Sequence, residues 1–510
     1  MNWRHRAWAA APLTLALLAA AGCAGTHDTR ARPTAAPTAP GAPSTSVARV
    51  CAEPAAGPTR APAGAVTVDP AVVGDVATKT KNNPPHTTFW LRPGRHRLDP
   101  DRYAQVIPKE GDRYLGAPGA VLDGQAKNQY AFGGSARDVT LRYLTVRSFV
   151  APQNEGVVNH DSADGWVIEH ATIRDNSGAG LMAGAHQRVR ANCLRDNGQY
   201  GLNAYKNGGP SGDLVVEGNE IAGNNTDDWE RRRPGCGCTG GAKFWAVNHA
   251  EVHGNWVHDN RGAGLWADTN NNDFRIEGNL IEGNDGAALI YETSYNAVIR
   301  TNTIRRNNWV EGRRAADRGD GFPFGAVYLS ESGGEPRIRA RTDKIEIYRN
   351  VLENNWNGIT LWENADRFCN SPANTSSGAC TLLVHDITRC AAPAIARAPL
   401  YGDCRWKTQR VDIHGNRFVL DESVVPCPAT CARMAVLANY GTYPDWSPYQ
   451  GERVAEAITG KQHNRWHDNV YLGPWRFVAH DPSRVLDSGQ WQGTPYQQDA
   501  GSTLDPRAGG

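Results

Sequence analysis

A short pattern of apolar and asparagine positions recurs through the middle of the chain. In each copy an apolar residue is followed by Asn after three positions, by a second apolar residue after two more, and by a second Asn after another three. Apolar and polar positions alternate, and Gly and Asn punctuate each segment, which is typical of short β-strands. The full copies begin at Val189, Val216, Val252, Ile276, Ile299 and Ile347, a degenerate copy spans residues 168–176, and a truncated one spans residues 413–418.

The spacing between copies sets the size of the repeat. Successive first Asn residues, from Asn192 onward, lie 27, 36, 24, 23 and 48 positions apart. A second strand-like segment lies between copies, as in residues 264–268 and 288–292. The short spacings leave room for about three short strands and no helix, and the long spacings indicate inserted loops. Leucine-rich repeats have a similar length but a Leu-dense consensus that is absent here, and propeller blades need about 40 residues. The pattern therefore predicts the coils of a β-helix.

The repeated Asn residues have a structural explanation in such a fold. In stacked coils, inward-facing side-chain amides form hydrogen bonds from one coil to the next at a spacing of about 4.8 Å. Each coil buries its apolar side chains only against its neighbours. We therefore expect an all-β, single-domain parallel solenoid with Asn ladders inside it.

Residues 87–98 and 116–124 resemble the first coils of pectate-lyase-like β-helix proteins. Residues 243–296 are similar to a motif block of secreted bacterial β-helix proteins. The resemblance covers roughly residues 65–480 and implies a right-handed parallel β-helix. It implies no single activity, because this superfamily includes lyases, hydrolases, epimerases and non-catalytic adhesins.

The first 23 residues have the pattern of an export signal. Arg4 and Arg6 precede an apolar run over residues 7–21, which ends at Ala-Gly-Cys23. This ending resembles a bacterial lipobox, which implies that Cys23 is lipidated and becomes the mature N-terminus. The apolar run is shorter than the roughly 20 residues of a membrane-spanning helix. We expect an exported protein held on the extracellular face of the membrane by a lipid.

Composition divides the rest of the chain. Residues 24–62 are rich in Ala, Pro and Thr and predict a disordered linker. Residues 63–480 are expected to form the β-helix, and residues 481–510 a C-terminal tail or cap that protects the open end of the stack. The net charge is +1, with 54 basic and 53 acidic residues, which argues against a nucleic-acid partner. We expect a monomer.

Ten cysteines follow Cys23, and export permits disulfide bonds. Six of them lie in loop-like segments late in the chain and are expected to form bridges among themselves, although sequence does not fix the pairing. Cys236 and Cys238 form a C-x-C motif, for which a structural disulfide is favoured over a metal site because further ligands at suitable spacing are absent. The six late cysteines are Cys369, Cys380, Cys390, Cys404, Cys427 and Cys431.

The second strand-like segments can be aligned on their leading Gly or Ala. Positions two and four then carry the apolar residues that face the core, so positions three and five face outward. A shift of one residue would turn this face inward. The third position contains Asn203, Lys243, Trp266, Ile290, Tyr328 and Thr360; the fifth contains Tyr205, Trp245, Asp268, Glu292, Ser330 and Trp362; the sixth adds Lys206, Thr269, Glu331 and Glu363.

Two carboxylates dominate this predicted face. Asp268 and Glu292 fall on adjacent coils, about 4.8 Å apart at the backbone. One of two such carboxylates is expected to have a raised pKa, which suits a general acid, and the spacing is nearer that of retaining than of inverting glycosidases. Lys243, one coil earlier, is a candidate base or charge neutraliser for a uronate. Alternatively, the carboxylates bind a structural cation such as Ca²⁺ or pair with Lys243 and Arg side chains.

Aromatic rings and polar groups around this pair suggest a sugar-binding surface, because aromatic faces stack on sugar rings. The loop over residues 310–324 is expected to rise beside the position-five column and wall a substrate site. We therefore predict a carbohydrate-active enzyme that acts on a polysaccharide by glycoside hydrolysis or β-elimination, with no certain cofactor. The alternative is a non-catalytic surface lipoprotein that binds glycan. The predicted catalytic residues are Asp268, Glu292 and Lys243, and the predicted substrate-binding residues are Tyr205, Trp245, Trp266, Tyr328, Trp362 and Glu363.

Overall fold

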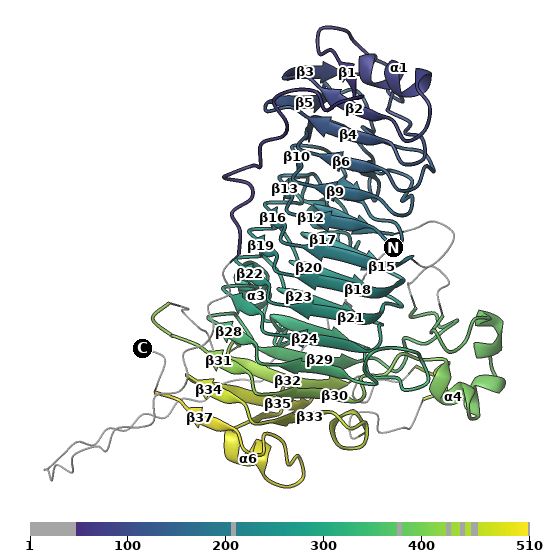
Figure 1. Cartoon of the computed structure of the whole chain (residues 1–510). Coiled ribbons are helices and arrows are strands. Elements are labelled where there is room, and N and C mark those ends of the chain that lie inside the picture. The colour runs from purple at the N-terminus through teal and green to yellow at the C-terminus, as the bar shows by residue number, and fades with distance from the viewer. Residues whose placement is uncertain are drawn as a thin grey trace, which may run out of the picture.

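The computed structural model describes residues 47–205, 211–374, 380–424, 430–438, 444–449 and 457–507. Strands in these residues stack coil upon coil into an elongated column, with the N-terminal coils at one end and the C-terminal coils at the other (Figure 1). Three long sheets run along the column, and their strands are parallel except at the last pair of the third sheet. The export segment, Cys23, Lys206 and Cys427 lie outside the described residues.

The first sheet has the stacking order β1 (Val66–Val68), β2 (Thr88–Leu91), β4 (Arg113–Gly116), β6 (Thr140–Arg142), β9 (Val167–Glu169), β12 (Arg188–Arg190), β15 (Ser211–Glu217), β18 (Val247–His253), β21 (Asn272–Glu277), β24 (Ala297–Arg300), β27 (Ile345–Tyr348), β30 (Val411–His414) and β33 (Arg465–His467).

The second sheet has the order β3 (Gly94–Arg97), β5 (Ala120–Asp123), β7 (Thr145–Arg147), β10 (Thr172–Arg174), β13 (Cys193–Arg195), β16 (Glu220–Ala222), β19 (Trp256–His258), β22 (Leu280–Glu282), β25 (Thr303–Arg305), β28 (Val351–Glu353), β31 (Arg417–Val419), β34 (Val470–Leu472) and β37 (Thr503–Asp505).

The third sheet has the order β8 (Gly156–Val158), β11 (Ala179–Met182), β14 (Leu202–Ala204), β17 (Ala242–Trp245), β20 (Leu265–Asp268), β23 (Leu289–Glu292), β26 (Val327–Ser330), β29 (Ile359–Glu363), β32 (Arg433–Ala438), β35 (Arg476–His480) and β36 (Val485–Leu486).

Helices are few among the described residues and lie outside the column. Helix α1 packs beside β1 and β3 at the N-terminal end (Figure 1). The helices are α1 (Asp75–Asn82), α2 (Trp229–Arg232), α3 (Trp309–Asp317), α4 (Leu400–Asp403), α6 (Ser488–Gln492), the short 3-10 turns η1 (Ile387–Cys390) and η2 (Ala394–Ala396), and the π-helical turn η3 (Ala457–Lys461). No helix among the described residues is long and apolar enough to cross a membrane.

The apolar residue that opens each sequence repeat occupies one continuous ladder in the core. Val252 pairs with Ile276, and Ile276 pairs with Ile299, in register across neighbouring strands of the first sheet. These side chains are almost fully buried, so each coil shields the apolar surface of the next. The fold class predicted from the repeat is thereby confirmed. The residues that open the sequence repeats form the ladder Ile168, Val189, Val216, Val252, Ile276, Ile299, Ile347 and Ile413.

The Asn residues of the repeat form two buried ladders, as the sequence predicts. Asn255 Nδ2 donates to Asn279 Oδ1 at 2.9 Å, and Asn279 Nδ2 donates to Asn302 Oδ1 at 2.9 Å. Each Nδ2 also donates to a main-chain carbonyl of the preceding coil, as Asn279 does to Val252. The first ladder lies at the turn between the first- and second-sheet strands, and the second lies at the turn between the second- and third-sheet strands, so the amides satisfy one another and main-chain carbonyls inside the stack. The second ladder consists of Asn176, Asn197, Asn224, Asn260, Asn284, Asn307 and Asn355.

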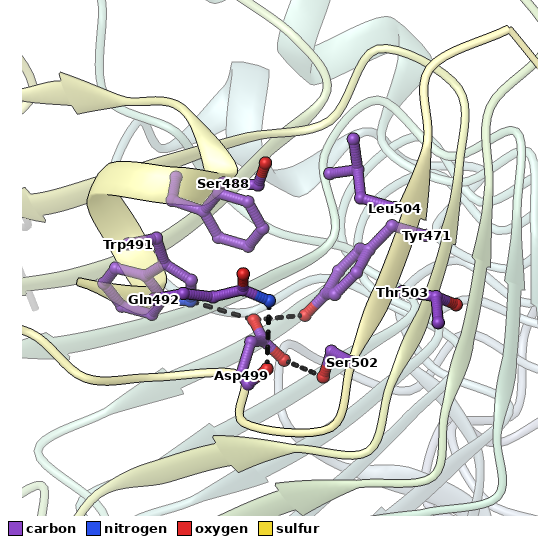
Figure 2. A pocket seen from close by; sticks show the side chains of 9 residues that line it. Tyr471, Ser488, Trp491, Gln492, Asp499, Ser502, Thr503 and Leu504 are labelled. Carbon is purple, nitrogen blue, oxygen red and sulfur yellow. Dashed lines mark hydrogen bonds between the residues drawn. The ribbon is translucent and has the colours of Figure 1, made fainter.

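A carboxylate ends the first Asn ladder near the C-terminus. Asn469 Nδ2 donates to Asp499 at 3.0 Å, and Asp499 also accepts from Trp491, Tyr471 and Ser502 at 2.8, 2.9 and 2.7 Å. Figure 2 shows the last three of these partners converging on Asp499, beneath helix α6. Asp499 is 1% exposed, and all its partners belong to the last coils and the segment that covers them. The small pocket that these side chains line is therefore part of the packing at the C-terminal end of the stack.

Residues 47–60, which we call the strap, run along the outside of the column (Figure 1). Cys51 is bonded to Cys193 of β13, and its amide donates to Glu220 of β16 at 2.8 Å. Further toward the N-terminal coils, Trp90 of β2 donates its indole N–H to the Pro58 carbonyl at 3.0 Å. The strap lies within the segment whose composition predicts a disordered linker, and its order comes from these contacts to the stack.

Candidate functional site

The outward face predicted for the third sheet has the predicted register. Lys243 pairs with Trp266, and Asp268 pairs with Glu292, on neighbouring strands. The same columns continue through Tyr328 and Ser330 to Thr360 and Trp362. The alternation of apolar and polar residues therefore placed these side chains on the correct face. We call the set Tyr205, Lys243, Trp245, Trp266, Asp268 and Glu292 the Asp268 face.

Lys243 and Asp268 form an ion pair. Lys243 Nζ lies 2.9 Å from Asp268 Oδ2, with 13% and 10% of the two side chains exposed, and 4.3 Å from the centre of the Trp266 ring. Thr269 donates its hydroxyl to Asp268 Oδ1 at 2.8 Å. Burial, the largest single influence, would lower the pKa of Lys243, but Asp268, Tyr200 and Glu292 together raise it above its ordinary value. A raised pKa favours the charged form of Lys243, which suits a charge neutraliser better than a base.

Glu292 is more deeply buried than Asp268, at 3% against 7% exposed. Trp266 donates its indole N–H to Glu292 Oε2 at 3.0 Å, and Arg367 NH1 lies 2.5 Å from Glu292 Oε1. Burial raises the pKa of Glu292, the positive charge of Arg367 lowers it, and the nearby charge of Asp268 raises it; the net change is upward. The expectation that one carboxyl of the pair would have a raised pKa is confirmed for Glu292.

Arg367 and Glu331 belong to the same cluster, although neither was among the predicted site residues. Arg367 NH1 also lies 3.2 Å from Glu331 Oε2, so one guanidinium joins both carboxylates. Glu331 is 1% exposed, and burial raises its pKa to about 7, against the lowering effect of Arg367. The sequence alignment of the strands could have identified Glu331, since it occupies the sixth position of its segment. Arg367 had no such signal in the sequence, because it lies in a loop 75 positions from Glu292.

An insertion between β29 and β30, residues 364–410, brings Arg367 to the face; residues 375–379 of it are not described. The bridges Cys369–Cys380 and Cys390–Cys404 close two short loops within it. Asn270, at the turn after β20, donates to the Cys380 carbonyl at 2.5 Å and accepts from the Trp406 indole at 3.0 Å. The predicted bridging among the late cysteines is confirmed for these four; Cys431 is also disulfide-bonded.

A second loop, residues 226–241, packs against the coils before Lys243, where Cys236 and Cys238 join a buried cluster with Met182 and Tyr200. Its Cys236 and Cys238 form a disulfide, as the C-x-C motif predicts. The Gly237 carbonyl between them accepts a short hydrogen bond from Lys243 Nζ. The disulfide loop therefore positions the ammonium group that neutralises Asp268.

The aromatic residues of the face differ in accessibility. Tyr205 is 41% exposed, and its ring meets that of Trp245 edge to face at 6.3 Å. Trp245 and Trp266 are half-buried. These three rings lie within or beside the open part of the face, where predicted sugar stacking remains sterically available.

Tyr328 and Trp362, also predicted to bind substrate, are covered by residues 318–324, which we call the cover segment. The ring of Phe324 lies 4.4 Å from that of Tyr328, and the ring of Phe322 lies 5.5 Å from that of Trp362. The predicted loop beside this face is thus present, as helix α3 followed by the cover segment. It packs onto the two rings and does not wall a site around them.

The prediction that Glu363 binds substrate is wrong. Its side chain is fully buried and pairs with Arg405. Thr408 donates its main-chain amide to Glu363 at 2.8 Å, and Gln462 donates its side-chain amide at 2.7 Å. Glu363 is the last residue of β29, where the insertion covers the strand end, so its carboxylate anchors the insertion.

The donor atoms of the face match ion pairing better than metal binding. Asp268 and Glu292 already face Lys243 and Arg367, whose positive charges repel a cation. Among the described residues, only Cys369, Cys380 and Cys390 bring three candidate ligand atoms together, and all three form disulfide bonds. The ion-pair alternative for the two carboxylates is therefore confirmed, and the Ca²⁺ prediction gains no support from the residues of this face.

The fold and this face define a right-handed parallel β-helix protein with a charged cluster on the third sheet. Residues 155–375 match the family described as right handed beta helix region. This match supports the right-handed parallel β-helix fold that the sequence predicts. No curated protein sequence matches the chain.

Solved structures with a similar fold include two carbohydrate enzymes. The mannuronan C-5 epimerase AlgE4 A-module of Azotobacter vinelandii is 12% identical with a TM-score of 0.45, over 87% of this chain and 97% of that one. The catalytic unit of the GH87 alpha-1,3-glucanase of Streptomyces thermodiastaticus strain HF3-3 is 14% identical with a TM-score of 0.46, over 83% and 69%.

Proposed function

We propose that this protein is a carbohydrate-active enzyme that hydrolyses glycosidic bonds at the Asp268 face. One observation carries the proposal. Asp268 and Glu292 lie in register on adjacent strands but in different environments, next to the exposed ring of Tyr205 and the half-buried ring of Trp245. Two carboxyl groups whose environments differ are the usual basis for separate acid and nucleophile roles.

The environments suggest which carboxyl group has which role. Glu292, buried and with a raised pKa, is the candidate general acid. Asp268, paired with Lys243 and more exposed, is the candidate nucleophile or charge stabiliser. Their backbones are about 4.8 Å apart, which is nearer the spacing of retaining enzymes.

Elimination is the less favoured chemistry. The raised pKa of Lys243 favours its charged form, so a base other than Lys243 would suit β-elimination at a uronate better. Lys243 retains the ability to neutralise a uronate carboxylate. An unsaturated product that absorbs in the ultraviolet would identify elimination.

Non-catalytic glycan binding is the second candidate function. The burial of Glu292 and its short contact with Arg367 favour it, because both restrict the access of Glu292 to a substrate. The exposed Tyr205 and half-buried Trp245 would serve binding equally well. The two functions are distinguished by whether the protein converts a bound glycan into products.

The test is a panel of xylan, alginate, polygalacturonate and a linear glucan, followed by reducing-end release and ultraviolet absorbance. Hydrolysis predicts reducing ends without ultraviolet absorbance, and D268N and E292Q should each lower the rate by at least about 100-fold. The matched control is D175N, an exposed carboxylate directly after strand β10 of the second sheet, which should keep full activity. Binding without turnover, lost in W245A and retained in D268N, would instead establish the glycan-binding function.

We also propose that the protein is exported and anchored through lipidated Cys23. The disulfide bonds support an oxidising location outside the cytoplasm. The expected result is that the chain is found in the membrane fraction and that C23S moves it to the soluble fraction. Recovery of unmodified protein in the medium would contradict the anchor.

A further inference from the structure

We infer that the Asp268 face binds the end of a glycan chain and not an internal segment. The inference rests on the proposed function of this face and adds the class of substrate to it. It depends on which neighbouring parts of the third sheet are covered.

The side toward the C-terminal coils is closed by the cover segment. Thr360 donates its hydroxyl to the Pro323 carbonyl at 2.5 Å, and Arg433 donates to the Gly321 carbonyl at 3.3 Å. The outward-facing side chains beneath the cover segment are inaccessible to solvent: Ile290 is 7% exposed, and Thr360 is fully buried. A sugar chain that crosses Glu292 therefore meets protein directly beyond it.

The two lateral sides are closed as well. At the strand ends, Thr269 is fully buried and Asn270 is bonded to the insertion. At the strand starts, Ala263 and Ala287 are buried with Ile290 in an apolar cluster that includes Phe324. A chain that lay along the strands would meet one of these two walls.

Among the described residues around the face, the fifth-position column toward the N-terminal coils holds the most exposed side chain, that of Tyr205. Tyr205 is 41% exposed and Trp245 is half-buried, whereas the third-position neighbour Asn203 is 4% exposed and donates its side-chain amide to the Asn154 carbonyl at 3.3 Å. A glycan at Asp268 can therefore continue in one direction, over Trp245 and Tyr205. Because a glycan can leave the carboxylates in one direction, its last sugar must be the one that lies at Asp268.

The first experiment measures binding stoichiometry, which does not depend on turnover. The full-length protein is titrated calorimetrically with size-fractionated oligosaccharides of the panel polymer that binds best. A low temperature keeps turnover slow. Chain-end binding predicts one protein per oligosaccharide whatever its length. A stoichiometry that rises with chain length would overturn the inference, and so would failure of every panel polymer to bind.

The second experiment follows products from oligosaccharides labelled at the reducing end. Chain-end action predicts a single labelled product size at the earliest time points, either one short fragment or the oligosaccharide shortened by one fixed unit, and a mixture of sizes would overturn it. The double variant F322A/F324A, which opens the covered side, should produce a mixture, whereas W256A on the second sheet should not. If the ratio of protein to oligosaccharide stays constant with chain length but no product forms, chain-end recognition is supported and the proposed hydrolysis is refuted.

Discussion

The guanidinium of Arg367 lies 2.5 Å from the carboxylate of Glu292, although the two residues are 75 positions apart. Glu292 comes from the regular part of the solenoid, and Arg367 comes from a loop stapled by disulfides. The contact brings a positive charge into a place where burial would otherwise make the ionised carboxylate costly. The charge state of the candidate site thus depends on a residue outside the repeat.

Removing the Arg367 guanidinium should destabilise the protein. In R367M, Glu292 and Glu331 keep their buried positions but lose the positive charge between them, at a cost of about 3–5 kcal/mol. Urea unfolding would measure the change. R389M, an exposed arginine of the same insertion, should shift the free energy of unfolding by less than about 0.5 kcal/mol. Equal midpoints for R367M and the wild type would contradict the ion-pair account.

Glu331 should make stability depend on pH. Its pKa is near the ordinary glutamate value in the unfolded chain and rises to about 7 in the folded protein, because of burial. Between these values the folded state binds more protons, so the free energy of unfolding falls as pH increases toward about 7 and then levels off. The loss amounts to at most about 3 kcal/mol. Urea midpoints across this range should fall for the wild type and change less for E331Q; parallel curves would refute the assignment.

Breaking an Asn ladder in its middle should cost several hydrogen bonds at once. Asn279 donates to Val252 and Asn302, and accepts from both nitrogens of Asn255. N279A leaves buried partners unsatisfied, with an expected loss of about 3 kcal/mol by thermal or urea unfolding. N248A provides the comparison, because exposed Asn248 makes one side-chain bond and should cost less than about 1 kcal/mol. Similar losses in both variants would show that the ladder adds nothing specific.

The strap should detach when its disulfide is removed. Cys51 and Cys193 are 142 positions apart, so their bond restricts the unfolded chain strongly, and the double variant C51S/C193S should lose up to about 5 kcal/mol. Hydrogen exchange should rise in residues 47–60 well before it rises in the core strands. A variant with unchanged exchange in the strap would show that contacts such as that of Pro58 with Trp90 hold it alone.

The repeat made the fold and the outward face predictable from the sequence. Apolar residues such as Ile276 and polar ones such as Asp268 alternate along each strand, and this alternation fixes which side chains face the core. Asn279 and its counterparts then fix how the coils are stacked. These signals are local and recur at a regular period, so they can be recognised without knowledge of distant contacts.

The coverage of the face was not predictable, because it is made by contacts between distant segments. Nothing local distinguishes buried Glu363 from open Trp245, and nothing in the spacing pairs Cys51 with Cys193 or brings Arg367 to Glu292. Loop conformation depends on whichever surface the loop meets, and the repeat does not encode that surface. The sequence by itself thus determined the solenoid and which side chains point outward, since both follow from a local period; only the tertiary structure decided which of them remain accessible and charged, since burial and ion pairing depend on the whole fold.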